Sequence, residues 1–142
     1  MLVAQILKDK GDQVFTCKPG DTVAEAARAL HEQRVGALVV RDQDRVVGIL
    51  SERDVVAAVA ADGAGALGRP VSSYMTRDVL FARPADAVDS LMERMTERRI
   101  RHLPVLNDTG LAGIVSIGDV VKYRLAEMEH EQEQMRNYIA SA

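Results

Sequence analysis

Two short segments of the sequence carry the residues best suited to bind a charged ligand. Each places a serine three residues before an aspartate, once as Ser51 with Asp54 and once as Ser116 with Asp119. A serine in this pattern can cap a helix by accepting hydrogen bonds from its free N–H groups. The start of a helix can also hold a phosphate, and an aspartate can accept from both hydroxyls of a ribose. The pattern thus indicates a helix cap, a nucleotide site, or both at once.

These two segments are the densest part of an internal duplication. A shift of 65 positions brings matching residue types together without a gap, from Val14 on Val79 to Val56 on Val121. The agreement is densest over residues 48–55, in which five residues of the first copy are identical to those 65 positions later. These pairs are Gly48 and Gly113, Ile49 and Ile114, Ser51 and Ser116, Asp54 and Asp119, and Val55 and Val120. Self-similarity at a fixed offset predicts two copies of one structural unit.

Both copies predict the same order of elements: strand, helix, strand, strand, helix. A helical spacing of apolar residues begins at Val23 and again at Val88, and Thr22 with Glu25 forms a capping box for the first of these helices. The remaining elements are two strands in each copy, at residues 37–41 and 46–50 and at residues 103–106 and 111–115, with second helices starting near Ser51 and Ser116.

The repeat predicts a mixed α/β (α+β) fold of two β-α-β-β-α units. A unit of roughly 55–60 residues buries too little surface to be stable alone. We therefore expect the two units to pack sheet to sheet about a pseudo-two-fold axis, with paired pockets in the cleft between them. The predicted boundaries are 1–61 for the first repeat, 62–70 for a Gly- and Ala-rich linker, 71–126 for the second repeat and 127–142 for a C-terminal helical extension.

The duplicated motif resembles the cystathionine-β-synthase (CBS) domain, which occurs in tandem as a Bateman module. The stretch Arg101-His102-Leu103-Pro104-Val105 is similar to the middle strand of that family, and the resemblance covers roughly residues 3 to 125. It implies a stand-alone regulatory module that binds an adenine nucleotide, such as AMP, ADP, ATP, NAD(H) or S-adenosylmethionine.

The resemblance also implies roles for individual residues. Asp54 and Asp119 would hold riboses, and Ser51 and Ser116 would face phosphates. A guanidinium beside the capping serine, at Arg53, suits phosphate well. The other residues that the resemblance places in or beside the nucleotide sites are Thr16, Cys17, Lys18, Gly36, Ala37, Phe81, Ala82, Arg83, Arg101, His102, Pro104 and Gly118.

The two copies differ at several of these positions. The second copy has Arg101, His102 and Pro104 where the first has Gly36, Ala37 and Val39, and the first has Arg53 where the second has Gly118. We therefore expect the two pockets to differ in affinity or in ligand. A basic cluster at Arg98, Arg99 and Arg101 is either a solvated helix end or a rim that attracts phosphate.

Composition excludes several classes of function. A net charge of −3 and few aromatic residues (4%) do not favour nucleic-acid binding, and no apolar run is long enough to span a membrane. Lys8, Asp9 and Lys10 interrupt the apolar start, so we expect no signal peptide. With Cys17 as the single cysteine, a reducing cytoplasm is expected. The scattered histidines predict no metal site, and no nucleophile–base set predicts an enzyme.

The C-terminal stretch predicts a long helix with a heptad seam. Val121, Leu125, Met128, Gln132, Met135 and Ile139 are spaced 4, 3, 4, 3 and 4 residues apart. This seam either packs on the core of its own chain or pairs with another chain, and we favour a homodimer. The regulated partner cannot be named from the sequence. The alternative to a nucleotide sensor is a ligand-free structural module for dimerisation or protein interaction.

Overall fold

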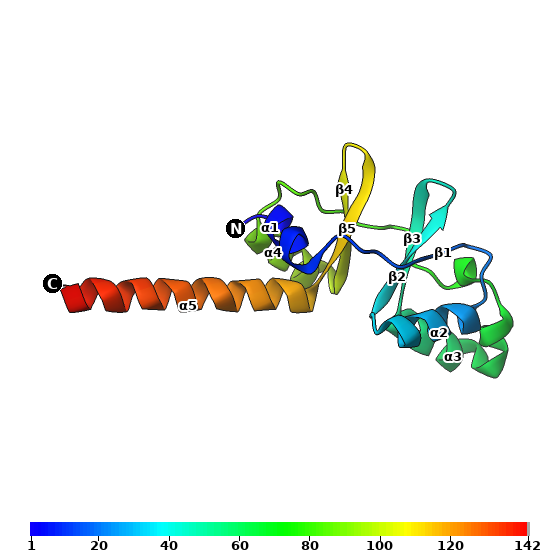
Figure 1. The fold of residues 1–142 in the computed structure, drawn as a ribbon. Helices are drawn as coiled ribbons and strands as arrows, with labels where there is room; N and C mark the ends of the chain where they lie inside the picture. The colour runs from blue at the N-terminus through cyan, green and yellow to red at the C-terminus, as the bar shows by residue number, and fades with distance from the viewer. Residues whose placement is uncertain (142) are drawn as a thin grey trace. The chain divides into compact units, whose positions relative to one another are not determined.

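The computed structural model describes residues 1–141, which divide into two compact units (Figure 1). One unit contains residues 13–80, and the other combines residues 1–12 with residues 81 onward. The predicted mixed α/β class is confirmed, because each unit holds both helices and strands. Within residues 1–141, no helix has the length and apolar character needed to cross a membrane.

The unit of residues 13–80 is built on a three-stranded sheet. Its elements are β1 (Thr16–Cys17), α2 (Val23–Gln33), β2 (Ala37–Asp42), β3 (Arg45–Ser51), α3 (Glu52–Asp62) and the short 3-10 helices η1 (Gly63–Gly68) and η2 (Val71–Ser73). Strand β2 lies in the centre, parallel to β1 and antiparallel to β3. The sheet and helices follow the predicted order of elements.

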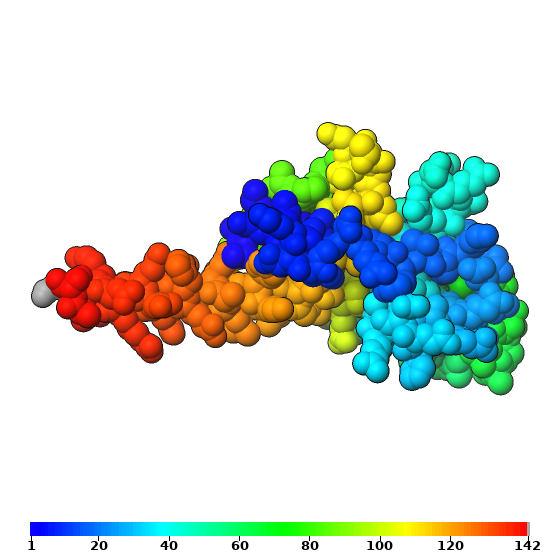
Figure 2. Space-filling view, in the orientation of Figure 1, coloured from blue at the N-terminus to red at the C-terminus, as the bar shows by residue number. Residues whose placement is uncertain are grey.

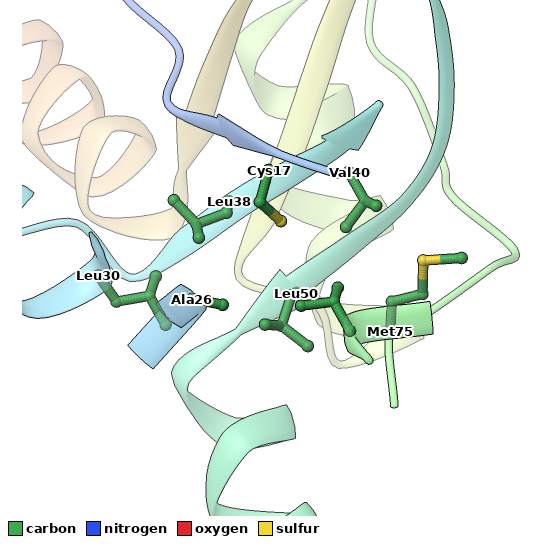
Figure 3. Packing of buried hydrophobic residues seen from close by; sticks show 8 residues of the cluster. Cys17, Ala26, Leu30, Leu38, Val40, Leu50 and Met75 are labelled. Atoms are coloured by element: carbon green, nitrogen blue, oxygen red, sulfur yellow. The ribbon is translucent and has the colours of Figure 1, made fainter. Parts of the chain in front are cut away.

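Local sequence explains how these elements begin and turn. The Thr22 hydroxyl caps α2 by accepting from the N–H of Glu25 (3.1 Å), which is one half of the predicted capping box. The β2–β3 hairpin turns at Gln43, whose φ of 56° lies in the left-handed region. Aliphatic side chains from the sheet, α2 and the segment after η2 then form the core shown in Figure 3: Cys17, Ala26, Leu30, Leu38, Val40, Leu50 and Met75.

In the part of the chain that the structure describes, the second unit has a two-stranded sheet and three helices. Its elements are α1 (Val3–Lys10), α4 (Val88–Arg98), β4 (His102–Asn107), β5 (Gly110–Ser116) and α5 (Ile117–Ser141). The strand expected before α4 is reduced to one parallel bridge between Ala82 and Val105. The N–H of Ala82 donates to the Pro104 carbonyl, and its own carbonyl accepts from Leu106, both at 2.9 Å. The proline at 84 then ends this short extended segment.

Helix α1 was not predicted from the sequence. Its Val3 and Ile6 are fully buried, at 0% exposure, although the last three residues of the same helix, 8–10, are charged. The predicted boundaries placed residues 1–61 in one repeat, whereas residues 1–12 contact the elements formed by residues 81–141. In the other unit, η2 and the residues after it pack on β3. Each compact unit thus combines one repeat with the segment that precedes the other repeat in the chain.

Two glycines at matching positions allow these segments to approach the strands. A Cβ on Gly48 in β3 would lie 2.6 Å from Met75 Sδ and 2.9 Å from the Thr76 carbonyl oxygen. A Cβ on Gly113 in β5 would lie 2.6 Å from Leu7 Cδ2. Both contacts lie within single units. At Gly48 the close backbone oxygen requires a glycine, whereas at Gly113 the end of the flexible Leu7 side chain would have to move to admit a Cβ.

The predicted linker at residues 62–70 is folded. Six of its residues form η1, and the Tyr74 hydroxyl donates to Asp62 at 2.7 Å while Arg69 pairs with Asp62 at 3.1 Å. This short network fixes the segment against the end of α3. Composition rich in Gly and Ala predicted a linker, and these small residues allow a tight 3-10 turn within it.

Candidate functional site

The first candidate site is the junction between β3 and α3, where Ser51 caps the helix. The N–H of Asp54 donates to Ser51 Oγ at 3.3 Å, and the N–H of Ser51 donates to Asp54 Oδ2 at 2.9 Å. The Ser51 hydroxyl also donates to the same Oδ2 at 3.1 Å. This is a complete capping box, so the helix-cap interpretation holds at this junction.

The junction between β5 and α5 repeats this geometry with one addition. The N–H of Ser116 donates to Asp119 Oδ2 at 2.9 Å, and the N–H of Asp119 donates to Ser116 Oγ at 3.2 Å. Lys10 of α1 then adds an ammonium group, which donates to Asp119 Oδ2 at 2.6 Å and to the Ile114 carbonyl at 2.9 Å. A lysine from the start of the chain therefore occupies one oxygen of the predicted ribose-binding carboxylate.

The two junctions differ because Lys10 and Met75 take equivalent places in the duplication. The 65-residue shift that superposes the repeats also superposes these two residues. Met75 packs its thioether against Gly48, so Asp54 receives no cation from that segment. Lys10 was not predicted as a site residue, because no helix was expected at residues 3–10. The shift itself, extended back to the start of the chain, was a signal that could have found it.

The charge of Lys10 alters the acidity of Asp119. Burial of the Asp119 carboxyl acts to raise its pKa. The hydrogen bonds from Lys10 and Ser116, together with the Lys10 charge, oppose burial and hold the pKa of Asp119 below its usual value. Asp119 is therefore an ionised carboxylate with one strong partner already in place.

Strand pairing brings further predicted residues to each junction. Ala37 pairs with Ser51 across β2 and β3, and His102 pairs with Ser116 across β4 and β5. The residue before β2 and the residue before β4 each accept a hydrogen bond from the first N–H of the following helix, α3 or α5, through the backbone carbonyl oxygen. Gly36 accepts from the N–H of Glu52 at 3.0 Å, and Arg101 accepts from the N–H of Ile117 at 2.8 Å. Both helix starts are thus fixed to both strands of the hairpin that precedes them.

The predicted base-flanking segments lie on the strand beside each hairpin. Thr16 and Cys17 pair with β2, while Lys18 turns away, its N–H donating to Asp21 Oδ2 at 2.9 Å. The matching N–H of Arg83 donates to Asp86 at 2.9 Å. The predicted residues with buried side chains are Ala37, Cys17, Ala82 and Pro104, so these offer a ligand mainly their backbone.

Cys17 is a buried cysteine with an unreactive thiol. Burial first, and then the charge of Asp21, raises the pKa of its thiol to about 11. A thiol with this pKa is protonated at neutral pH and is a poor nucleophile. Its role is to pack in the core of the sheet.

Each junction keeps donors and acceptors that the cap does not use. All hydrogen bonds to Asp54 and Asp119 within the described residues fall on Oδ2, which leaves Oδ1 of both carboxylates as an acceptor. The cap uses the N–H of the third residue of each helix, and the second N–H, of Arg53 or Gly118, stays outside it. Arg53 is exposed beside the first junction. An acceptor for hydroxyls thus lies next to donors for an anion.

The other candidates from the sequence gain no ligand-binding geometry. Arg98 lies in the last turn of α4 and Arg99 is its left-handed C-cap, as Arg34 is for α2. Both interpretations of the basic cluster, helix end and phosphate rim, remain compatible with these exposed positions. Among residues 1–141, no three metal-ligating side chains come together.

A separate groove lies between α2 and α3. Its lining contains none of the predicted nucleotide-binding residues, although Glu52 and Val55 flank the first junction in sequence. The groove is lined by Ala27, Leu30, His31, Glu32, Arg34, Val35, Glu52, Val55 and Val56. The hydrogen-bonding groups that suit a nucleotide lie at the junctions and not in this groove.

Comparison with known proteins gives a consistent result. The family profile of the CBS domain matches residues 3–61 and 71–126. The chain is 34% identical to the CBS domain-containing protein CBSX3, mitochondrial, of Arabidopsis thaliana, over 96% of this chain and 71% of that protein. The CBS-domain containing protein ATU1752 from Agrobacterium tumefaciens superposes with a TM-score of 0.85 at 46% identity, over 87% of this chain and 99% of that one.

A further solved structure contains ligands. The CBS domain pair of protein MJ0100, in complex with 5′-methylthioadenosine and S-adenosyl-L-methionine, superposes with a TM-score of 0.79. It is 26% identical, and the match covers 89% of this chain and 98% of that one.

Proposed function

Because this chain belongs to the CBS-domain family, we propose that it is a non-catalytic regulatory module that binds an adenine nucleotide, AMP, ATP or NAD(H), at its two Ser-x-x-Asp junctions. The observation that carries the proposal is the unused Oδ1 of Asp54 and of Asp119, each beside the start of a helix. The related MJ0100 pair, which binds two adenosine-containing molecules, supports this ligand class.

The residues suit the parts of a nucleotide in different ways. A ribose hydroxyl can donate to the carboxylate, and a phosphate can accept from the second N–H of the helix, where the helix dipole favours negative charge. In the first site, the exposed guanidinium of Arg53 adds a charge-assisted partner for phosphate. In the second site, Arg101 and His102 lie at the junction, and His102 faces Ser116 in the strand register.

The two sites are proposed to bind with different affinities. At Asp119, a ribose hydroxyl on Oδ1 must share the charge of the carboxylate with the ammonium of Lys10, which is 2.6 Å from Oδ2. At Asp54, no lysine among residues 1–141 contacts the carboxylate, and Arg53 is available for phosphate. We therefore expect the Asp54 site to bind an adenine nucleotide more tightly than the Asp119 site.

Calorimetric titration with AMP, ATP, NAD and NADH tests the proposal. Asp54→Ala removes hydrogen bonds worth about 1.5–3 kcal/mol and should weaken binding about 10- to 100-fold. Asp119→Ala should weaken only the second binding event in the titration, which is the weaker binding of nucleotide at the Asp119 site. Asp89→Ala is the matched control, because Asp89 is an exposed carboxylate in the first turn of α4 without a capping serine. Binding unchanged by both site variants would refute the assignment of the sites.

A ligand-free interaction module is the second candidate function. One observation favours it: capping hydrogen bonds already account for the serine and aspartate of each motif. On this hypothesis, none of the four nucleotides binds the intact chain at millimolar concentration. Asp54→Ala would then lower only the stability of α3.

The proposal also covers the localisation of the module, its oligomeric state and the kind of partner on which it acts. We place the module in the cytoplasm as a homodimer that acts on a partner protein, and not on nucleic acid or a membrane. The mild formal charge of −3 supports this choice of partner, because a strong basic patch is the usual basis for binding either polyanion.

A further inference from the structure

The apolar seam of α5 is exposed along its length. We define the α5 seam as residues 121, 125, 128, 132, 135 and 139. Val120 anchors the start of the helix at 0% exposure, but the apolar members of the seam face solvent: Val121 45%, Leu125 55%, Met128 47%, Met135 60% and Ile139 67%. Figure 2 likewise shows the dark-orange-to-red C-terminal part of α5 standing clear of other segments in that view. The seam therefore covers no core of its own unit within the described residues.

We propose that the α5 seam binds the same seam of a second copy as a parallel, two-stranded coiled coil. Spacings of four and three residues in alternation keep one stripe of a helix facing a partner. The stripe spans residues 121 to 139 of an uninterrupted helix. The inference does not depend on nucleotide binding, because no seam residue belongs to either proposed site.

The polar member of the seam favours the parallel orientation. In a parallel pair in register, Gln132 meets Gln132 of the partner subunit, and the two amides can hydrogen-bond to each other. In an antiparallel pair with full overlap, Gln132 would face Met128 of the partner subunit. Its amide would then lose water without gaining a partner, which destabilises that arrangement.

The charges that flank the seam favour the same orientation. In a parallel pair, Glu131 lies beside Arg136 of the partner subunit, and Arg124 lies beside Glu129 of the partner subunit. An antiparallel pair would bring Glu131 to the partner's Glu131 and Glu129 to the partner's Glu129. Both pairs would then be repulsive. Because Arg124 already contacts Glu127 of its own helix at 3.2 Å, the pair formed by Glu131 and Arg136 is the clearer one to test.

Disulfide trapping of the full chain tests contact and orientation together. In a parallel pair, the thiols of an Ile139→Cys variant meet in the seam, whereas in an antiparallel pair they lie about 27 Å apart. Asn137→Cys is the matched control, because residue 137 points away from the seam in the heptad. We expect roughly tenfold more disulfide-linked dimer from Ile139→Cys than from Asn137→Cys under mild oxidation, since disulfides require Cβ atoms within about 4.5 Å. Equal trapping of the two variants would overturn the proposal.

Charge reversal tests the ion pair by sedimentation velocity. Glu131→Arg places like charges opposite each other twice per dimer and should weaken self-association roughly tenfold. Adding Arg136→Glu to the same chain should restore it. A wild-type chain that stays monomeric at 100 µM, or a double variant no better than the single one, would contradict the parallel coiled coil. These outcomes are independent of the titrations with nucleotides, so each proposal can fail alone.

Discussion

Replacing Lys10 with methionine, the residue found at the matching position 75, makes the second site resemble the first. In the wild type, the Lys10 ammonium donates to Asp119 Oδ2 at 2.6 Å and to the Ile114 carbonyl at 2.9 Å. The two side chains of this ion pair are 32% and 22% exposed, so solvent screens the attraction only in part. Lys10→Met is therefore expected to lower the free energy of unfolding by about 1–2 kcal/mol.

The same substitution should strengthen nucleotide binding at Asp119. Without the ammonium, a ribose hydroxyl on Oδ1 no longer shares the charge of the carboxylate, so the roughly 1–2 kcal/mol of the ion pair sets an upper gain of about five- to thirtyfold in affinity. The assay is calorimetric titration with AMP in an Asp54→Ala background, which leaves the Asp119 site as the proposed binding site. Lys8→Met is the matched control, because Lys8 is an exposed lysine on the same helix. Unchanged affinity would refute competition by Lys10, and weaker binding would show that Lys10 instead holds the phosphate.

The stability difference should also depend on pH with a defined sign. The pKa of Asp119 is below its usual value in the folded chain, so its contribution is present above the unfolded pKa. That contribution is lost as the pH falls through the folded pKa. Wild type and Lys10→Met should therefore differ most near neutral pH and converge in acid, as measured by urea unfolding. A difference that stays constant into strong acid would refute the role of the ion pair.

Three further predictions concern the packing and capping of the first unit and its matched positions. Gly48→Ala should destabilise the chain by about 1–3 kcal/mol, and by more than Gly113→Ala does. The Cβ of the new alanine at position 48 would meet the rigid Thr76 carbonyl as well as a flexible side chain, and thermal unfolding of both variants checks this difference. Cys17 should react with iodoacetamide slowly at pH 8 and much faster in urea, because its thiol pKa is raised to about 11; equal rates would contradict its burial. Ser51→Ala should cost about 1 kcal/mol through loss of the α3 cap, measured by urea unfolding, and no loss would contradict the capping geometry.

Periodicity predicted the parts of the fold that depend on local pattern. The helix at Val23, the hairpins and the two capped helix starts follow from spacing and from capping chemistry, and they form as expected. Helix α1 escaped prediction because eight residues with only Val3 and Ile6 buried give a weak periodic signal. Its stability comes from contacts with residues more than 80 positions away, such as the hydrogen bond from the N–H of Val3 to the Asp86 carbonyl at 2.9 Å. No local pattern encodes such a contact.

The candidate site was predictable only in part for a similar reason. The serines and aspartates follow from the motif, and the strand register places Ala37 and His102 beside them. The 65-residue shift matches Lys10 with Met75, but the contact of Lys10 with Asp119 requires the packing of α1 near β5, which the sequence does not show. Gly113 lacks a side chain and so permits α1 to pack close to β5. This role cannot be predicted without the position of Leu7, whose side chain contacts Gly113.

The packing of α1 on residues from the other end of the chain has a consequence for folding during synthesis. Residues 13–80 contain all the segments of their unit, so its internal contacts can form before the rest of the chain is synthesised. Helix α1 leaves first but must wait for its partners: the Tyr123 hydroxyl, 118 positions later, donates to the Gln5 carbonyl at 3.1 Å, and Lys10 reaches Asp119 across 109 positions. Closing so long a loop is slow relative to forming local contacts. A chain that lacks residues 1–12 should therefore keep the fold of residues 13–80. The second unit, which is completed last, would lack the helix that covers it.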